Sequence, residues 1–407
     1  MRVVLVVPTF PKLSETFVSN KAVGLAERGV DVHIVCASSP KEEWDNFAAG
    51  HRIHGLRDRV HLTAPSIRRG TITASLAEHA RAAAAIPAPV RRNYLSNDTD
   101  GWGARIRHLL ADAPVQRLRA DVVHFEFGSL AVGRTDIGQH GGTAMTVSFR
   151  GFDLAYVGLE NANHYRDVWT SADGIHVLSE ALWRRALERG APENLAHTVI
   201  PPAVDADSIQ ISEPRPGRLG TVDSPLRILA VGRLHWVKGY DHMLDAIARA
   251  VHQGLHVEVR IVGDGDLFEW VHYWRHDLGL DEIVTFVGAL PADEVAQQFQ
   301  WADLFVQAST FEGFCNAALE AQAHGVPVVS TDAYGLADNV EHGRTGLVVG
   351  RRDPASMASA IDALAADGDK RAAMGNAGAE RARTRFGLHD QLDDWISFYE
   401  TAIQRRR

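Results

Sequence analysis

The sequence contains little of what several classes of protein require. Its 407 residues include only two cysteines, Cys36 and Cys315, which form neither a disulfide framework nor a CxxC metal pair. The 20 histidines show no metal-ligand spacing, and the net charge of −9 comes with no long basic block. We therefore expect no metal and no nucleic-acid partner.

Long apolar runs are also missing. No stretch approaches the roughly 20 apolar residues of a membrane-spanning helix. The apolar run after Met1 is too short for a signal peptide. A cytoplasmic location is expected, and peripheral membrane contact stays open. GxSxG, HExxH and Walker patterns are absent as well.

Short apolar runs alternate with segments of helical periodicity along most of the chain. This alternation is typical of a parallel sheet with helices on both faces. A stretch rich in proline and glycine, residues 201–220, separates two such series. We therefore expect an α/β fold with two doubly wound, Rossmann-like domains, residues 1–203 and 204–387, facing across a cleft that holds the ligand.

The expected elements follow from this periodicity. Strands are expected at 3–7, 30–36, 122–125, 144–149, 174–178 and 197–200, and then at 226–231, 257–262, 283–287, 304–306, 326–329 and 346–349. Helices are expected from Ser14, as the capping residue, to about residue 28, and at 71–86, 102–110, 180–189, 314–323, 354–366, 370–385 and 389–404. Residues 38–70 are expected to be irregular.

The segment from Ser309 to Ser330 holds two carboxylates beside an expected helix start. Glu312 precedes the helix, and Glu320 lies about two turns inside it. Free backbone N–H groups of Phe314 to Ala317 would favour an anion there. This arrangement suits a ligand with both phosphates and hydroxyls, such as a nucleotide sugar. The alternative is a capping carboxylate and a solvated helix glutamate.

Two cations follow the first strand of the expected second domain. Arg233 comes after Gly232 at the carboxyl end of the strand, and Lys238 opens the next helix. A planar guanidinium and an ammonium group beside a helix N-terminus could clamp a diphosphate and replace a divalent metal. The alternative is a pair of surface basic residues.

A glycine-rich turn begins at Gly263 after another expected strand. Phe268 occupies the third glycine position of a GxGxxG pattern, so the evidence for a nicotinamide site is weak. A helix-capping turn near a nucleotide base is favoured instead.

Loops after the strands of the first domain are candidates for the acceptor side of the cleft. They contribute Glu15, Thr16, Phe127, Arg150 and Asp153. Capping or packing roles for these loops remain open as alternatives.

Four segments together resemble a known family. GRLHWVKG (232–239), VGDGDLFEWV (262–271), VTFVGALP (284–291) and the stretch 309–349 are similar, in order, to the retaining GT-B glycosyltransferases. Glu312 and Glu320 match the E-x7-E signature of that family. The opening PTFPKLSETFVSNKAVGLAERGVDVHIV and SFRGFDL (148–154) resemble its exopolysaccharide, colanic-acid-type branch.

The resemblance implies roles for individual residues. Arg233 and Lys238 would hold the donor diphosphate, Glu312 the sugar hydroxyls and Glu320 the ribose, with Arg233, Lys238 and Glu312 as the catalytic set. It also implies that helix 388–407 packs back on the first domain. The implied donor-binding residues are Gly232, Arg233, Lys238, Gly263, Phe286, Val287, Gly288, Glu312, Gly313, Phe314, Cys315, Asn316, Ala317 and Glu320.

The chain departs from the family pattern at two places. Arg150 stands where many members have histidine, although the exopolysaccharide branch resembles this chain there. Ser14, Glu15 and Thr16 stand where many members have a glycine pair. Both departures concern contacts expected from the first domain.

The resemblance implies transfer of a sugar, with retention, from a nucleotide-diphosphate sugar to a hydroxyl of a saccharide, lipid-linked or natural-product acceptor. A UDP-sugar is the favoured donor and a GDP-sugar the second choice, with no cofactor. Two alternatives remain open at this point: a nucleotide-sugar epimerase of the same fold, and a catalytically silent nucleotide-sugar-binding subunit of a polysaccharide assembly complex.

Overall fold

A computed structural model provides the structure of the chain, and it describes residues 1–47, 52–63, 84, 86, 88, 91–92, 101–139, 142–206, 209 and 217–407. These residues form two compact units. The first unit contains residues 1–177, 183–200 and 392–407, and the second contains residues 178–182 and 201–391. The helix expected at 71–86 lies outside the described residues.

The first unit is built on a seven-stranded parallel sheet in the order β3-β2-β1-β4-β5-β6-β7. Its central strands are almost fully buried because helices cover both faces of the sheet. All six expected strands are present, and β3 was not predicted. The strands are β1 (Arg2–Thr9), β2 (Asp31–Ser38), β3 (Val60–Leu62), β4 (Val122–Phe125), β5 (Ala144–Phe149), β6 (Gly174–Val177) and β7 (His197–Val199).

Helices connect these strands, and two of them correct the prediction. The helix α1 begins at Thr16 with Glu15 in the N-cap position, so the prediction that Ser14 caps it is wrong. The helix expected at 102–110 continues to Leu118. The helices are α1 (Thr16–Glu27), α2 (Lys41–Asp45), α5 (Trp102–Leu118), α6 (Gly128–Ala131), α7 (Gly151–Ala155), α8 (Arg166–Ser171) and α9 (Glu180–Glu188), with 3-10 turns η1 (Leu13–Glu15), η2 (Arg52–Arg59) and η3 (Thr135–Gln139).

The second unit is built on a six-stranded parallel sheet in the order β10-β9-β8-β11-β12-β13. Every expected strand is present, with ends that differ by at most two residues. The strands are β8 (Leu226–Val231), β9 (Val257–Val262), β10 (Val284–Gly288), β11 (Leu304–Gln307), β12 (Val328–Thr331) and β13 (Gly346–Val349). Two sheets of this kind confirm the expected α/β class with two Rossmann-like domains.

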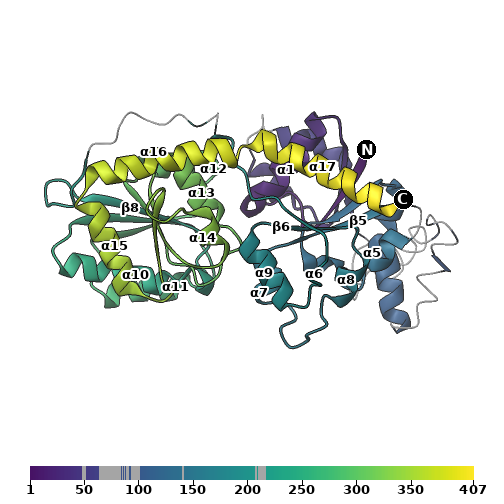
Figure 1. Ribbon diagram of the computed structural model, residues 1–407, viewed down its shortest axis with the longest axis horizontal. Coiled ribbons are helices and arrows are strands. Elements are labelled where there is room, and N and C mark those ends of the chain that lie inside the picture. Colours follow the sequence, from purple (N-terminus) through teal and green to yellow (C-terminus); the bar gives the residue numbers. More distant parts are fainter. Residues whose placement is uncertain are drawn as a thin grey trace. The chain divides into compact units, whose positions relative to one another are not determined.

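Helices cover both faces of the second sheet. Figure 1 shows α10, α11 and α15 on one side of it and α12, α13 and α16 on the other. The elements are η5 (Trp236–Lys238), α10 (Tyr240–His252), α11 (Phe268–Asp277), α12 (Ala292–Trp301), α13 (Asn316–Ala323), α14 (Gly335–Asn339), α15 (Pro354–Ala365), α16 (Gly368–Arg385) and α17 (Leu388–Arg406).

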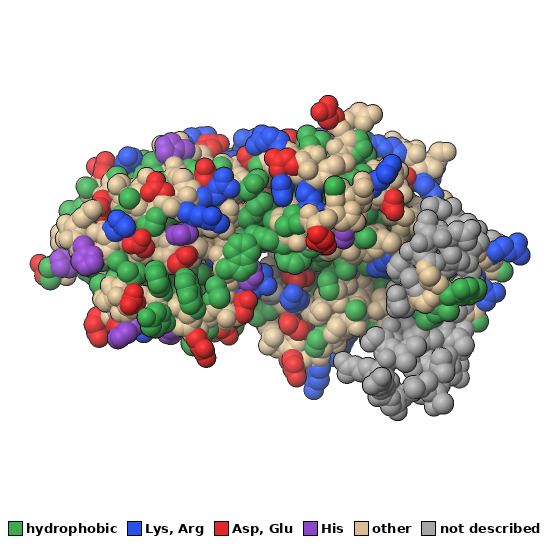
Figure 2. Space-filling view, turned by 90° about the horizontal axis from the view of Figure 1, so that it is seen from below, with side chains coloured by type: hydrophobic (Ala, Val, Ile, Leu, Met, Phe, Trp, Pro, Cys, Tyr) green, Lys and Arg blue, Asp and Glu red, His purple; other side chains and the backbone are tan. Residues whose placement is uncertain are grey.

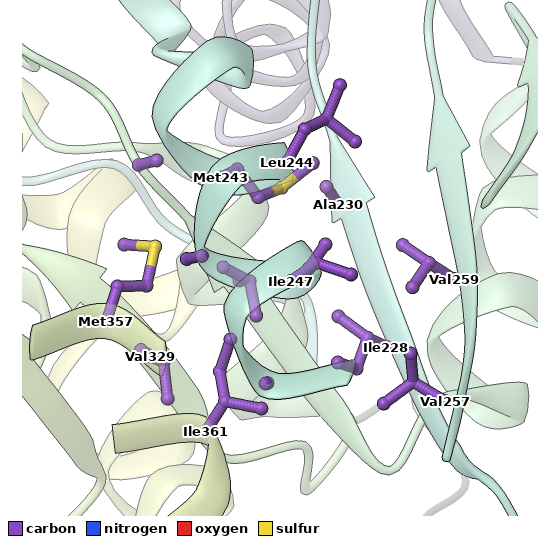
Figure 3. Close-up of a cluster of buried hydrophobic side chains, with 14 of the residues drawn as sticks. Ile228, Ala230, Met243, Leu244, Ile247, Val257, Val259, Val329, Met357 and Ile361 are labelled. Carbon is purple, nitrogen blue, oxygen red and sulfur yellow. The ribbon is translucent and has the colours of Figure 1, made fainter. Parts of the chain in front are cut away.

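An apolar core fixes the strands that carry the site of the second unit. Ile228 of β8 and Val259 of β9 pack against Leu244 and Ile247 of α10, and Ile361 of α15 closes the cluster (Figure 3). All five side chains are almost fully buried. On the outer surface that Figure 2 displays, side chains of both charges are interspersed with apolar ones.

The last helix, α17, contributes its apolar stripe to the first unit. Leu392, Trp395, Phe398 and Tyr399 are buried. Leu392 packs closely on α1 at Gly24, because a Cβ at Gly24 would lie 2.4 Å from Leu392 Cδ1 and the leucine side chain would have to shift. The apolar stripe of the sequence is thus explained by residues 392–407 belonging to the first unit.

Candidate functional site

Lys238 and Glu312 form an ion pair in the second unit, 74 residues apart in sequence. Lys238 Nζ lies 2.5 Å from Glu312 Oε1, and their side chains are 19% and 14% exposed. Burial by itself would lower the pKa of Lys238, but Glu312 and its other neighbours outweigh this effect and raise it. Lys238 therefore carries a full positive charge at neutral pH.

The topology of the sheet explains why these two residues meet. Lys238 follows β8 and Glu312 follows β11, and these two strands are neighbours although they are not consecutive in sequence. The strand order reverses at this point, and open α/β sheets bind ligands beside the carboxyl ends of such strands. The pair thus lies at the position where sheets of this kind bind ligands.

A chain of hydrogen bonds orients the carboxylate of Glu312. Gln307 Nε2 donates to Ser309 Oγ at 2.7 Å, and Ser309 Oγ donates to Glu312 Oε1 at 2.9 Å. Thr331 Oγ1 donates to the carbonyl of Ser309 at 2.5 Å. Because one oxygen of Glu312 accepts from both Ser309 and Lys238, the Oε2 atom remains for a ligand.

Asn339 holds the part of the loop that follows Glu312. Its side chain is fully buried, and Nδ2 donates to the carbonyls of Phe314 and Cys315 at 2.9 and 2.8 Å. Its Oδ1 accepts from Gln322 Nε2 at 2.8 Å. The loop between Glu312 and the helix is therefore held by one amide that satisfies two backbone acceptors.

The helix of the E-x7-E segment, α13, begins later than expected. Its first residue is Asn316, and Cys315 stands in the N-cap position with φ of +75°, a left-handed conformation that favours glycine. The expectation that the helix begins at Phe314 is wrong, because this left-handed residue interrupts the run. Glu312 does not cap the helix, since its carboxylate pairs with Lys238.

Glu320 lies inside α13 and has a different environment from Glu312. No residue that the structure describes donates a hydrogen bond to its carboxylate. Burial raises the pKa of Glu320 to about 7. A half-buried carboxylate that has no partner among the described residues is suited to accept hydrogen bonds from a ligand hydroxyl.

Close backbone contacts explain the glycines after β8 and β9. A Cβ at Gly263, whose φ is +139°, would lie 2.1 Å from the carbonyl oxygen of Gly232. The N–H group of Gly263 donates to the carbonyl of Gly288 at 2.8 Å. These three glycines therefore bring the carboxyl ends of β8, β9 and β10 together without side chains between them.

The remaining donor-side candidates lie around this edge of the sheet. The Arg233 side chain is exposed, and no described residue pairs with its guanidinium. Phe286 of β10 stacks on His272 of α11, with ring centroids 3.9 Å apart. Val287 is partly buried next to it, and Ala317 and Asn316 lie in the first turn of α13. The carbonyl of Gly313 accepts from Ser179 Oγ at 3.1 Å.

The acceptor-side candidates all belong to the first unit. Glu15 is the N-cap of α1 and pairs with Lys12 at 2.6 Å, and Thr16 begins the helix. Phe127 is the N-cap of α6. Arg150 and Asp153 form a capping box at the start of α7. Capping thus engages the side chain of Asp153 and the backbone of Arg150, and the guanidinium of Arg150 makes further contacts.

Among the described residues, no group of three or more His, Cys, Asp or Glu side chains is placed to hold a metal ion. None of the helices described is long and apolar enough to cross a membrane.

Several residues of the site were not predicted from the sequence. Ser309 and Gln307 orient Glu312, and Asn339 anchors the loop, yet polar side chains at these positions have no distinctive local pattern. The signal available was the position of Gln307 and Ser309 directly after an apolar strand, at the edge where ligands bind.

Comparison with known proteins places these features in a family. Residues 214–381 match the model of the glycosyl transferases group 1. The amylovoran biosynthesis glycosyltransferase AmsK of Erwinia amylovora is 29% identical over 375 residues, which cover 86% of this chain and 88% of that protein. The putative colanic acid biosynthesis glycosyltransferase WcaL of Escherichia coli strain K12 is 26% identical, covering 87% and 88%.

A further relative matches over a shorter range. A D-inositol 3-phosphate glycosyltransferase of Stackebrandtia nassauensis is 34% identical over 231 residues, which cover 54% of this chain. The chain spans about half the length of that relative, since 52% of it is covered.

Solved structures agree with this on the level of the fold. Anabaena Alr3699/HepE in complex with UDP superposes with a TM-score of 0.69 at 17% identity, covering 98% of this chain and 99% of that chain. S. aureus TarM, in a complex that contains UDP, gives a TM-score of 0.71 at 12% identity, covering 98% and 99%. The chain therefore contains a glycosyl transferases group 1 domain at residues 214–381 and has the GT-B fold, and over most of its length it is similar to exopolysaccharide and colanic acid glycosyltransferases.

Proposed function

We propose that this chain transfers a sugar from a nucleotide-diphosphate sugar to a hydroxyl of an acceptor, with retention at the anomeric carbon and without a metal. The observation that carries the proposal is the paired Lys238 and Glu312 at the strand-order reversal of the second sheet. The pair places a cation and a hydroxyl acceptor side by side, which are the two groups that a sugar diphosphate requires.

Each charged group has a proposed role in binding the donor. Lys238 and the exposed Arg233 hold the diphosphate. The Oε2 atom of Glu312 accepts from sugar hydroxyls. The partnerless Glu320 accepts from the ribose hydroxyls, and the glycines after β8 and β9 leave room for the phosphates.

The proposed chemistry proceeds on one face of the sugar. The bond between the anomeric carbon and the phosphate oxygen breaks, and the acceptor oxygen forms its bond to the same face of that carbon. The departing phosphate oxygen takes the proton of the acceptor hydroxyl. Lys238 and Arg233 stabilise the negative charge that develops on the diphosphate. A double displacement would need a carboxylate nucleophile near the anomeric carbon, a role not assigned to Glu312.

A UDP-sugar is the proposed donor. Two structures of the same fold, HepE and TarM, were solved with UDP. A GDP-sugar is the second choice, because a relative 31% identical over 194 residues is named as a GDP-mannose-dependent mannosyltransferase of Mycobacterium tuberculosis. The acceptor class follows the relatives AmsK and WcaL, whose names refer to polysaccharide biosynthesis.

A donor panel tests the proposal directly. The protein is incubated with UDP- and GDP-sugars, with and without saccharide acceptors, in buffer containing EDTA. Release of nucleotide diphosphate and an α-linked product from an α-linked donor, both unaffected by EDTA, are the expected results. Conversion of the donor into an epimer without acceptor would show an epimerase instead. Binding of donor without hydrolysis or transfer under any condition would show a silent binding subunit.

We expect donor affinity to rise with pH through the ionisation of Glu320. Burial raises the pKa of this carboxyl to about 7 in the free protein, so below that pH it is protonated and accepts hydrogen bonds poorly. Binding through the carboxylate should release a proton, and the donor Kd should fall about tenfold between pH 6 and pH 8. Calorimetric titration with a UDP-sugar, in buffers of different ionisation enthalpy, measures both the affinity and the proton release.

The variant Glu320→Gln is expected to bind the donor more weakly and to lose this pH dependence. Glu294→Gln, which changes an exposed carboxylate of α12, should keep it. The stability of the unliganded protein should depend on pH in the opposite direction. Because the folded-state pKa of Glu320 lies above that of the unfolded chain, its contribution to stability is present below about pH 4.5 and is lost as the pH rises through about 7. A donor Kd that stays constant from pH 6 to pH 8 would contradict the role of Glu320.

A further inference from the structure

Two cations share a single buried carboxylate in the first unit. Glu126 follows β4 and Arg150 follows β5, so both lie at the carboxyl ends of neighbouring parallel strands. Lys21 Nζ of α1 contacts Glu126 Oε1. Arg150 Nη2 donates to Glu126 Oε2 at 2.9 Å, and Arg150 Nε donates to the carbonyl of Glu126 at 2.9 Å. Each carboxylate oxygen is thus taken by a different cation.

Aromatic rings surround this triad and limit its contact with water. The side chains of Lys21, Glu126 and Arg150 are 3%, 0% and 12% exposed. Lys21 Nζ lies 3.8 Å from the ring centroid of Trp395, a residue of α17. The guanidinium carbon of Arg150 lies 3.9 Å from the centroid of Phe17. In such surroundings an unbalanced charge is costly. The number of cations in the cluster therefore has to be compared with the number of carboxylates.

Among the described residues, no second carboxylate forms an ion pair with Lys21 or Arg150. The Asp153 carboxylate accepts from the backbone N–H groups of Ser129 and Arg150 at 2.9 and 3.0 Å. Burial lowers the pKa of His124 and His176 far below the usual range, so both rings are neutral. They are tied into a hydrogen-bonded chain through Ser148 Oγ.

Lys21 itself keeps its proton at neutral pH. Burial lowers its pKa to about 8, while Glu126 acts in the opposite direction. The triad therefore carries one positive charge in excess.

Arg150 has the most exposed side chain of the triad, at 12% against 3% for Lys21 and 0% for Glu126. No described residue accepts a hydrogen bond from its Nη1 atom. Arg150 thus offers a fixed guanidinium with one donor that no described residue uses.

We propose that Arg150 binds an oxyanion of the acceptor, so that the acceptor class is a saccharide carrying a carboxylate or a phosphate. The inference rests on the proposed function, because it names the acceptor of that reaction. A guanidinium recognises both anions by its planar fork, and one already held by Glu126 loses little entropy on binding. Lys21 and Glu126 act as positioning residues, since they hold the guanidinium and touch no ligand.

Matched sugar probes test this inference. The protein is first saturated with UDP, so that anions cannot occupy the donor diphosphate site. Methyl glucuronide, methyl glucoside and glucose 6-phosphate are then titrated by calorimetry. The glucuronide or the phosphate should bind at least about tenfold more tightly than the glucoside, because a charge-assisted hydrogen bond is lost in the neutral sugar. The tighter of the two anionic probes identifies carboxylate or phosphate as the group recognised.

Variants of the triad separate ligand binding from folding. Arg150→Gln should remove the preference for the anionic probe, and it leaves Lys21 and Glu126 as a balanced pair, so the thermal midpoint should change little. Arg150→Lys keeps the charge but not the fork and should keep part of the preference. Arg52→Gln removes an exposed cation of the same unit, paired with Glu27, and should keep all of it.

Three results would overturn the inference: equal affinity for glucuronide, phosphate and glucoside, no measurable binding of any anionic probe, or an undiminished preference in Arg150→Gln. If Arg150→Gln does not fold, an undiminished preference in Arg150→Lys has the same meaning. Failure of the wild-type protein to bind UDP, with the anion preference intact, would instead contradict the proposed function and leave the anion site standing.

Discussion

Replacing Lys238 with methionine should lower kcat at saturating donor by about 10²–10³-fold, the range seen when one donor to a developing oxyanion is removed. The ammonium group is fixed by Glu312 at 2.5 Å and carries a full charge, so its field acts on the departing diphosphate without reorganisation. Methionine keeps the length and apolar surface of the side chain. Single-turnover measurements at saturating UDP-sugar report the chemical step itself.

Two further variants make this result interpretable. Lys370→Met changes an exposed lysine of α16 in the same unit and should leave kcat unchanged. The double variant Lys238→Met with Glu312→Gln should restore stability lost by leaving a half-buried carboxylate unpaired, but it should not restore turnover. Near-normal turnover in Lys238→Met would show that the cation is structural and that another group stabilises the leaving diphosphate.

Replacing Asn339 with alanine should destabilise the second unit by about 2–4 kcal/mol, because two buried carbonyls and one buried amide lose their partner at once. The side chain is fully buried, and it bonds the carbonyls of Phe314 and Cys315 and the amide of Gln322. Donor binding should weaken as well, since the same amide holds the loop between Glu312 and α13. Urea unfolding measures the first effect and calorimetric titration with a UDP-sugar the second.

Asn376→Ala is the matched control, because Asn376 is an exposed asparagine within α16. Alanine there should be neutral or slightly stabilising, since it favours the helix more than asparagine does. A change below about 0.5 kcal/mol in Asn339→Ala, the size expected for an ordinary surface position, would mean that water replaces the lost amide and that the loop does not depend on it.

The sequence predicted the strands well because most are short apolar runs, and several, such as β4, β11 and β12, are buried on both faces. β8, β9 and β13 were predicted to the residue. β3 was missed because Val60–Leu62 is only three residues long and has a polar centre. The start of α13 was placed two residues early because the left-handed backbone at Cys315 leaves the periodic pattern unchanged. Periodicity reports which face is buried, and it does not report the backbone conformation of one residue.

The candidate site was accessible to sequence reasoning only in part. Lys238 and Glu312 were each selected from a separate segment, and their roles stay predictions. Their contact could not be predicted from a local pattern, because the two residues are 74 positions apart in the sequence. The triad of Lys21, Glu126 and Arg150 was hidden for the same reason. Only Arg150 stood out in sequence, whereas Lys21 looks like an ordinary helix lysine. Long-range ion pairs depend on which strands become neighbours, and that follows from the topology.

The two cysteines can report on the opening of each unit separately. Cys36 is buried in the first unit and Cys315 in the second, and burial raises their thiol pKa values to about 11 and about 12. A protected, protonated thiol reacts with an alkylating reagent only when its surroundings open. Mass spectrometry of the labelled peptides can therefore time the opening of each unit separately in the unmodified chain. If a ligand slows the labelling of one cysteine alone, the unit that contains this cysteine is the one that the ligand binds.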